Sequence, residues 1–158
     1  MSQTAADRTT AFLDENRIPY EVLPHRSAFT AQGVAASLHV SGWNVAKVVV
    51  VHASGAPAFL VVLPAACRLD LDALGRVIGK TDLSLAGEPE LRELFPDCEV
   101  GAMPPFGNLY GIPVLVDACL PQTGAFVFQA GNHHEVIRMS YGDFERLAQP
   151  VVADVCRH

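Results

Sequence analysis

The chain has 158 residues, of which 50% are hydrophobic and 18% are charged. This composition excludes disorder for most of the chain and predicts one globular domain over 1–158. Eleven basic against seventeen acidic residues give a net charge of −6, so any RNA must meet a small local basic site. No stretch approaches the roughly 20 apolar residues that span a bilayer, and the N-terminal segment lacks the apolar core of a signal peptide. We therefore expect a cytoplasmic protein.

Local signals place helices and strands along the whole chain. The β-branched runs at 45–52 and 58–63 flank a turn-forming segment and predict a hairpin of central strands. Thr30 is a suitable N-cap, and Ser140-x-x-Asp143 resembles a capping box before the last helix. The predicted elements, in chain order, are a helix over 5–17, a strand over 20–23, a helix over 31–39, strands over 45–52 and 58–63, helices over 70–78 and 88–95, strands over 112–116, 125–129 and 136–139, and a helix through Leu147.

The order of these elements indicates the fold class. Helices are inserted among five or six strands, and some connections are short enough for hairpins, which favours an α+β fold over a strictly alternating doubly wound one. We predict a single domain with a central mixed, mostly antiparallel sheet flanked by helices. The segment 98–111 carries three glycines and two prolines, so it should be a shaped loop.

Cysteine spacing gives no support to a zinc or dithiol motif. No two cysteines form a C-x-x-C pair, so neither a zinc knuckle nor a thioredoxin-like site is indicated. We interpret all four as ordinary thiols and keep a catalytic nucleophile as the alternative. They are Cys67, Cys98, Cys119 and Cys156.

The segment Gly131-Asn132-His133-His134-Glu135 is the other candidate metal site. Adjacent histidines in a strand point to opposite faces, so His133 and His134 could not bind one ion without a bulge. P-loop, G-x-S-x-G and H-E-x-x-H motifs are absent from the sequence. We therefore expect no metal site and no bound zinc.

Lys47 is unusual because it lies inside the run V-A-K-V-V-V-V, and the chain has only one other lysine, Lys80. Burying an ammonium in such a strand is costly unless a partner compensates the charge. Two interpretations remain open. Lys47 could protect an edge strand from pairing with another chain, or it could hold a phosphate or another anionic group at the rim of a pocket.

The loop Gly101-Ala102-Met103-Pro104-Pro105-Phe106-Gly107 is the second candidate. Its prolines fix their own φ angles and its glycines allow close backbone approach, so the loop could hold amide donors toward a ligand carbonyl. A tight surface turn is the alternative.

The order of these features resembles the YbaK family, also called the prolyl-tRNA synthetase-associated or aminoacyl-tRNA editing domain. The resemblance covers about 8–148. The matching features are a helix opened by Thr30, the strand with Lys47, the L-D-L-D-A-L segment, a G-x-x-x-P loop from Gly101 to Pro105, and the closing G-N-H-H-E-V-I-R-M-S-Y-G-D-F-E-R-L.

The resemblance implies a YbaK-like aminoacyl-tRNA deacylase that hydrolyses the ester of mischarged tRNA in trans, with no metal or organic cofactor. The expected partners are the aminoacylated 3′ end of tRNA and, as a second candidate, an aminoacyl-tRNA synthetase, but neither a membrane nor DNA. By resemblance, Lys47 is the principal functional residue, and Gly101 and Pro105 contact the aminoacyl ester. The implied mechanism is substrate-assisted. A non-catalytic tRNA- or synthetase-binding module of the same fold is the alternative.

Other positions are candidates for substrate binding by the same resemblance. The chain has Ala102-Met103-Pro104 where several family members carry a G-G-x-S-P loop, and Met103 and Phe106 would change the size of the pocket, so the amino acid removed is left open. Gly131 and His133 occupy a glycine-polar segment near the family's pocket, where His134 is the alternative to His133. The full set of predicted substrate-binding residues is His25, Thr30, Met103, Phe106, Gly131 and His133.

Overall fold

A computed structural model describes residues 4–24, 31–120 and 124–157 of the chain. The helices are α1 (Ala5–Glu15), α2 (Ala31–Leu38), α3 (Leu71–Ile78), α4 (Glu88–Leu94) and α5 (Tyr141–Ala148), with 3-10 turns η1 (Gly42–Asn44) and η2 (Gly107–Leu109). The strands are β1 (Tyr20–Pro24), β2 (Ala46–Ala53), β3 (Phe59–Pro64), β4 (Arg68–Leu69), β5 (Leu83–Leu85), β6 (Val114–Asp117), β7 (Ala125–Gln129), β8 (Glu135–Ser140), β9 (Val151–Ala153) and β10 (Cys156–Arg157).

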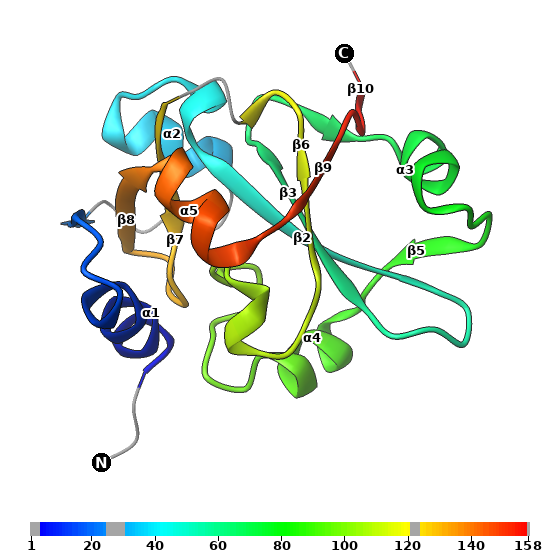
Figure 1. The fold of residues 1–158 in the computed structure, drawn as a ribbon, viewed down its shortest axis with the longest axis horizontal. Coiled ribbons are helices and arrows are strands. Elements are labelled where there is room, and N and C mark those ends of the chain that lie inside the picture. The colour runs from blue at the N-terminus through cyan, green and yellow to red at the C-terminus, as the bar shows by residue number, and fades with distance from the viewer. Residues whose placement is uncertain (1–3, 25–30, 121–123, 158) are drawn as a thin grey trace.

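The described strands form three sheets. The central sheet has the order β5-β2-β3-β6-β9, in which β2 pairs antiparallel with β3 and β5, whereas β6 pairs parallel with β3 and β9. A second sheet, β1-β8-β7, is antiparallel, and β4 pairs with β10 in a third. Figure 1 shows α2 and α3 beside opposite ends of the long strand β2. The predicted α+β class with a mixed sheet is confirmed.

The hydrophobic core lies on both faces of the central sheet. Between the two larger sheets, Val50 and Val62 pack with the aromatic side chains of β7 and α5. On the other face, α2 covers one apolar cluster that includes Val45 and Val127, while α3 covers another that includes Val51. Within the described ranges, each helix is too short or too polar to cross a bilayer.

The predicted hairpin and helices agree with the structure to within a few residues, but some local details differ. Ser140 is the N-cap of α5, yet its side chain makes no capping hydrogen bond, so the predicted capping box is wrong. The prediction also missed β4, β5, β9 and β10. These strands have only two or three residues each, too few to produce a hydrophobic pattern.

Candidate active site

Lys47 lies on an interior strand. β2 has β3 on one side and β5 on the other, and Val45, just before β2, forms an isolated parallel bridge with Val127 of the second sheet. An interior strand offers no free edge for another chain to pair with. The edge-protection interpretation of Lys47 is therefore wrong, and its charge needs another explanation.

The Lys47 side chain leaves β2 on the face covered by α2 and α3. Val45 packs in the cluster beneath α2 and Val49 in the cluster beneath α3, so Lys47 emerges between the two helices. Its Nζ donates a hydrogen bond of 2.8 Å to the main-chain oxygen of Cys67. Burial lowers the pKa of the ammonium, the nearby Cys156 and Cys67 sulfur groups oppose this effect, and the Arg68 guanidinium lowers the pKa further. A charge retained at this cost is typical of a functional residue.

Gln129 ends β7, whose Val127 bridges to Val45 just before Lys47, and sequence reasoning missed it. The parallel bridge joins Val45 to Val127, so Lys47 and Gln129, each two residues further along, lie on the same face as the bridging pair. Gln129 is buried, and its Nε2 lies 3.2 Å from Nδ1 of His133. Because this pairing joins distant parts of the chain, no local pattern could have revealed it.

His133 connects this face to the G-x-x-x-P loop. Its Nε2 lies 2.9 Å from the carbonyl oxygen of Val100, which can only accept, so Nε2 carries the proton. Nδ1 is then free to accept from the Gln129 amide. The backbone N–H of His133 donates to Oε2 of Glu99 at 3.2 Å. These bonds hold the buried imidazole of His133 against Val100, the residue that precedes Gly101.

The loop presents Gly101 on its outer side. Gly101 is exposed and has φ +87°, and a Cβ built on it would lie 3.8 Å from Cε1 of His133. Its N–H donates to no acceptor within the described part of the chain, so this donor can reach a ligand oxygen. The next residue closes the loop, since Ala102 N–H donates to Glu99 and Ala102 O accepts from Gly131 N–H at 2.7 Å.

The rest of the loop is buried beneath Gly101. Pro105 and Met103 are buried, and Phe106 is 0% exposed, with its ring against those of Phe12 and Phe128. Direct contact between Phe106 and a substrate does not fit this position, so any effect of Phe106 on selectivity would be indirect. Truncating Met103 would open a cavity in the core, so a change in selectivity there would come with a loss of stability.

Gly131 has a packing role beside α1. Its φ is +110°, and a Cβ at this position would lie 2.4 Å from Cβ of Ala5. We expect Gly131→Ala to lower the melting temperature because of this overlap and the unfavourable φ, with a smaller effect on the rate constant of ester hydrolysis. Thermal unfolding of the variant, alone and combined with Ala5→Gly, measures the overlap. Failure of Ala5→Gly to restore any stability would contradict the packing role.

The remaining predicted residues have different positions. His25 and Thr30 lie outside the described residues. His133 and His134 lie in the turn before β8 rather than in a strand, and His133 is buried whereas His134 is exposed. Neither histidine belongs to the metal-ligand-like cluster that the described residues form, which consists of Cys67, Asp117 and Cys156.

A cleft of about 820 Å³ opens on the other side of Gly131, among α1, β1 and the turn 130–135. Asp7, Glu99 and Glu135 line it, and Lys47 does not. Acidic side chains repel phosphates, so this cleft is a poor site for the tRNA end. The Lys47 face, with Gln129, His133 and Gly101, is the better candidate.

Comparison with known proteins agrees with this fold. A sequence model of the aminoacyl-tRNA editing domain matches residues 25–147. The prolyl-tRNA editing protein ProX of Acetoanaerobium sticklandii is 26% identical over 154 residues, which cover 94% of this chain and 93% of that protein. A solved protein proposed to be a trans-editing enzyme for prolyl-tRNA synthetase has a TM-score of 0.84 at 22% identity over 100% of both chains. A hypothetical protein has a TM-score of 0.85 at 24% identity, covering 95% of this chain and 99% of that one.

The family match spans most of the chain, so the chain belongs to the aminoacyl-tRNA editing domain family. Its class is therefore that of the deacylases that hydrolyse the ester between an amino acid and tRNA. The solved structures show the same α+β fold. The predicted family, fold class and enzyme class are confirmed, whereas the roles of the individual site residues stay predictions.

Proposed function

We propose that the chain removes a wrongly attached amino acid from tRNA specific for proline. The name of the ProX relative, which covers nearly all of this chain, supports this substrate. The observation that carries the proposal is Lys47, a half-buried ammonium on an interior strand, on the same face as Gln129, whose amide meets His133 beside the exposed Gly101. This arrangement can hold an anionic or hydroxylated group near an amide donor.

The proposed reaction uses the substrate's own groups. Lys47 anchors a phosphate or the ribose of the terminal adenosine, and Gly101 N–H polarises the ester carbonyl. A water molecule that the free ribose hydroxyl orients attacks this carbonyl. The ester C–O bond breaks, water supplies hydroxide to the acyl group, and a proton goes to the ribose oxygen. Positioning and stabilisation of the oxyanion can provide much of the reduction in the barrier for an activated ester.

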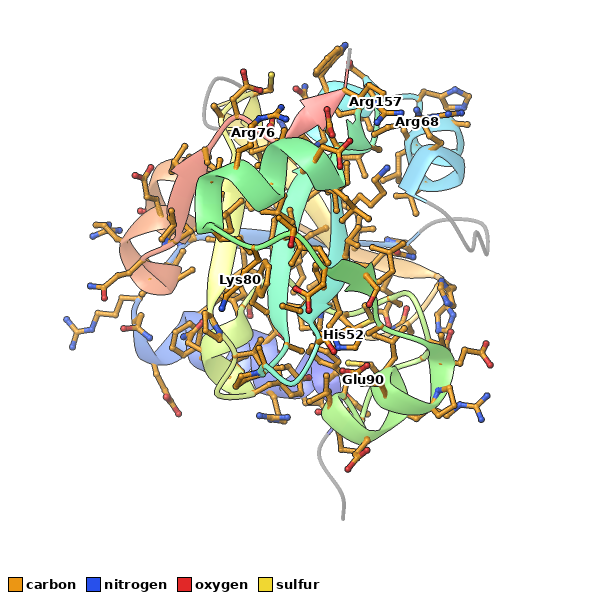
Figure 2. All side chains as sticks on the ribbon, turned by 90° about the vertical axis from the view of Figure 1, so that its right-hand side faces the viewer. His52, Arg68, Arg76, Lys80, Glu90 and Arg157 are labelled. Carbon is orange, nitrogen blue, oxygen red and sulfur yellow. The ribbon has the colours of Figure 1, made fainter. Side chains whose placement is uncertain are left out.

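A local basic surface supports contact with RNA. Figure 2 shows Arg68, Arg76 and Arg157 around α3 and β10 on one side of the molecule, and we call these three residues the arginine surface. Arg68 and Arg157 face each other in the β4–β10 pair. Arg68 is also close enough to Lys47 to lower its pKa. The arginine surface therefore borders the proposed ester site and offers guanidinium groups to the phosphates of the acceptor end.

Reversing this charge should weaken tRNA binding. We expect Arg68→Glu/Arg157→Glu to raise KM for mischarged tRNA by about tenfold at low salt and to flatten the dependence of binding on salt concentration, because phosphate contacts release counterions. Measurements of KM across a salt series test this. Arg92→Glu is the control, because Arg92 lies on α4, whose Glu90 is at the other end of the view in Figure 2. Equal salt slopes for the double variant and the wild type would contradict a role for the arginine surface.

A panel of mischarged tRNAs tests the proposed function. An apolar pocket discriminates one methylene by about 1–3 kcal/mol, so we expect release, at unequal rates, of more than one small amino acid among alanine, serine, cysteine and, from a tRNA specific for another amino acid, proline. Release should also be faster from proline-specific tRNA than from another tRNA carrying the same amino acid. Binding without release would instead identify a non-catalytic tRNA- or synthetase-binding module. Strict use of a single amino acid would contradict sieving by size.

A further inference from the structure

Cys67, Asp117 and Cys156 form a compact cluster of potential metal ligands. The two Sγ atoms and a carboxylate oxygen all lie within 4.8 Å of one another. The residues are 3%, 0% and 8% exposed, respectively. Cys67 precedes β4, Asp117 ends β6 and Cys156 begins β10, so the cluster joins three distant segments. Cysteine spacing predicts no zinc site because it cannot show that the fold brings these side chains together.

Asp117 brings a buried negative charge to the cluster. Its Oδ1 accepts a hydrogen bond of 3.0 Å from Val155 N–H, and its Oδ2 accepts one of 2.9 Å from Cys119 N–H. Within the described residues, no basic side chain forms an ion pair with Asp117, and its side-chain partners are the thiols of Cys119 and Cys156, which donate to the carboxylate. A buried carboxylate is costly without such compensation. The two backbone bonds orient the carboxylate and still leave lone pairs for a cation, as hydrogen bonds around metal ligands do.

We propose that Cys67, Asp117 and Cys156 bind one Zn²⁺ ion, with a water molecule completing the tetrahedron. Two thiolates and a carboxylate suit zinc, whereas Mg²⁺ and Ca²⁺ require oxygen ligands throughout. Bonds of about 2.1–2.3 Å need donor atoms about 3.5–4 Å apart, a small adjustment from the arrangement observed. Each thiol releases its proton to solvent when it binds, and no oxidation or reduction is involved.

Three protein ligands and a water are the coordination of an open zinc site, but the burial of all three residues keeps a substrate away, so we assign the ion a role in holding β10. β10 is held to β4 through only two residue pairs, Cys156 with Leu69 and Arg157 with Arg68. An ion bound at Cys156 and Cys67 adds a second connection between β10 and the segment before β4, and opening of β10 gives the ion a path of entry. Ester hydrolysis does not pass through this ion. Deacylation should therefore persist after chelation at temperatures well below unfolding.

Metal binding can be measured directly on the full chain without tRNA. Purified protein should contain one zinc per chain, and the metal-free protein should bind Co²⁺ with a thiolate-to-cobalt charge-transfer band and the visible bands of tetrahedral coordination. Saturating zinc should raise the melting temperature by about 5–10 °C. Cys67→Ser/Cys156→Ser should abolish the bands and the shift. Cys98→Ser should preserve both, because this thiol lies instead beside the Tyr110 hydroxyl.

Several results would overturn the zinc site. The first is that the fully reduced wild-type protein binds Co²⁺ without a thiolate-to-cobalt band, or that zinc does not change its melting temperature. Another is a Cys67–Cys156 disulfide whose reduction restores no metal binding. These measurements use the wild-type chain, so they remain decisive if the double variant does not fold. Equal zinc contents in the folded double variant and the wild type would also exclude the site.

Discussion

Replacement of Lys47 by alanine is expected to lower kcat/KM for mischarged tRNA by about 10- to 100-fold or more. A hydrogen bond to a charged group contributes about 1.5–3 kcal/mol, and we propose that the ammonium holds the anionic or hydroxylated end of the substrate. Lys47→Met is the companion variant because it keeps most of the apolar stem. Steady-state deacylation kinetics measure both effects.

The stability of these variants separates function from folding. Burial lowers the pKa of Lys47, so the folded state disfavours its charge, and we expect Lys47→Met to unfold at the wild-type temperature or above. Lys80→Ala is the matched control: Lys80 is the only other lysine and is exposed after α3. It should keep kcat/KM within about twofold. A fully active, stable Lys47→Ala protein would contradict the role of Lys47.

The lowered pKa of Lys47 also predicts two opposite pH dependences. Because the folded-state pKa lies below the unfolded-state value, the cost of burying the charge is fully present below the folded pKa. That cost disappears as the pH rises from the folded-state pKa to the unfolded-state pKa of Lys47. The free energy of unfolding therefore increases across this interval. The part of kcat/KM that depends on Lys47 decreases over the same pH interval, because the ammonium loses its proton. Comparing pH profiles of the wild type and Lys47→Met isolates this part.

Gly101→Val is expected to reduce kcat by about 100-fold. The backbone at Gly101 has φ +87°, a conformation that β-branched residues essentially avoid, so valine would reorient the N–H that we propose to face the ester carbonyl. Loss of one oxyanion donor typically costs about 10²–10³ in kcat. Single-turnover deacylation with saturating protein separates this loss from weaker binding.

Gly55→Val controls for backbone strain. Gly55 has φ +72° in the β2–β3 turn, and an added Cβ would meet nothing within 4 Å. Both valine variants should lose stability for the same reason, while only Gly101→Val loses activity. If Gly101→Val folds normally and hydrolyses the ester at the wild-type rate, the loop is a turn without a catalytic role.

Local sequence signals predict those elements that are stabilised by interactions between residues close together in the sequence. The N-terminus of α3 follows from Asp70, whose carboxylate accepts hydrogen bonds from the N–H groups of Asp72 and Ala73. The β2–β3 hairpin likewise follows from two β-branched runs across one turn. By contrast, β9 and β10 depend on pairing with strands far away in the chain, and their own residues carry no distinguishing pattern.

The same distinction applies to the site. Lys47 stands out because a charge interrupts an apolar strand, and Gly101 because glycine and proline shape the loop around it. Gln129 could not be selected in this way, since its proximity to Lys47 comes from the parallel bridge between Val45 and Val127. Glutamine is usually exposed, and the sequence does not show that this one is buried. Without the strand pairing, nothing therefore identifies Gln129 as a site residue.

Lys47 donates its hydrogen bond to the main-chain oxygen of residue 67, and the thiol of that residue takes no part in the bond. Any side chain compatible with the same turn would present the same acceptor. One position thus serves two requirements: its backbone orients the ammonium, while its side chain affects the ammonium only electrostatically and can vary more widely. Related chains could exchange the cysteine for another residue and keep the lysine in place, so the two properties can be gained or lost separately during evolution.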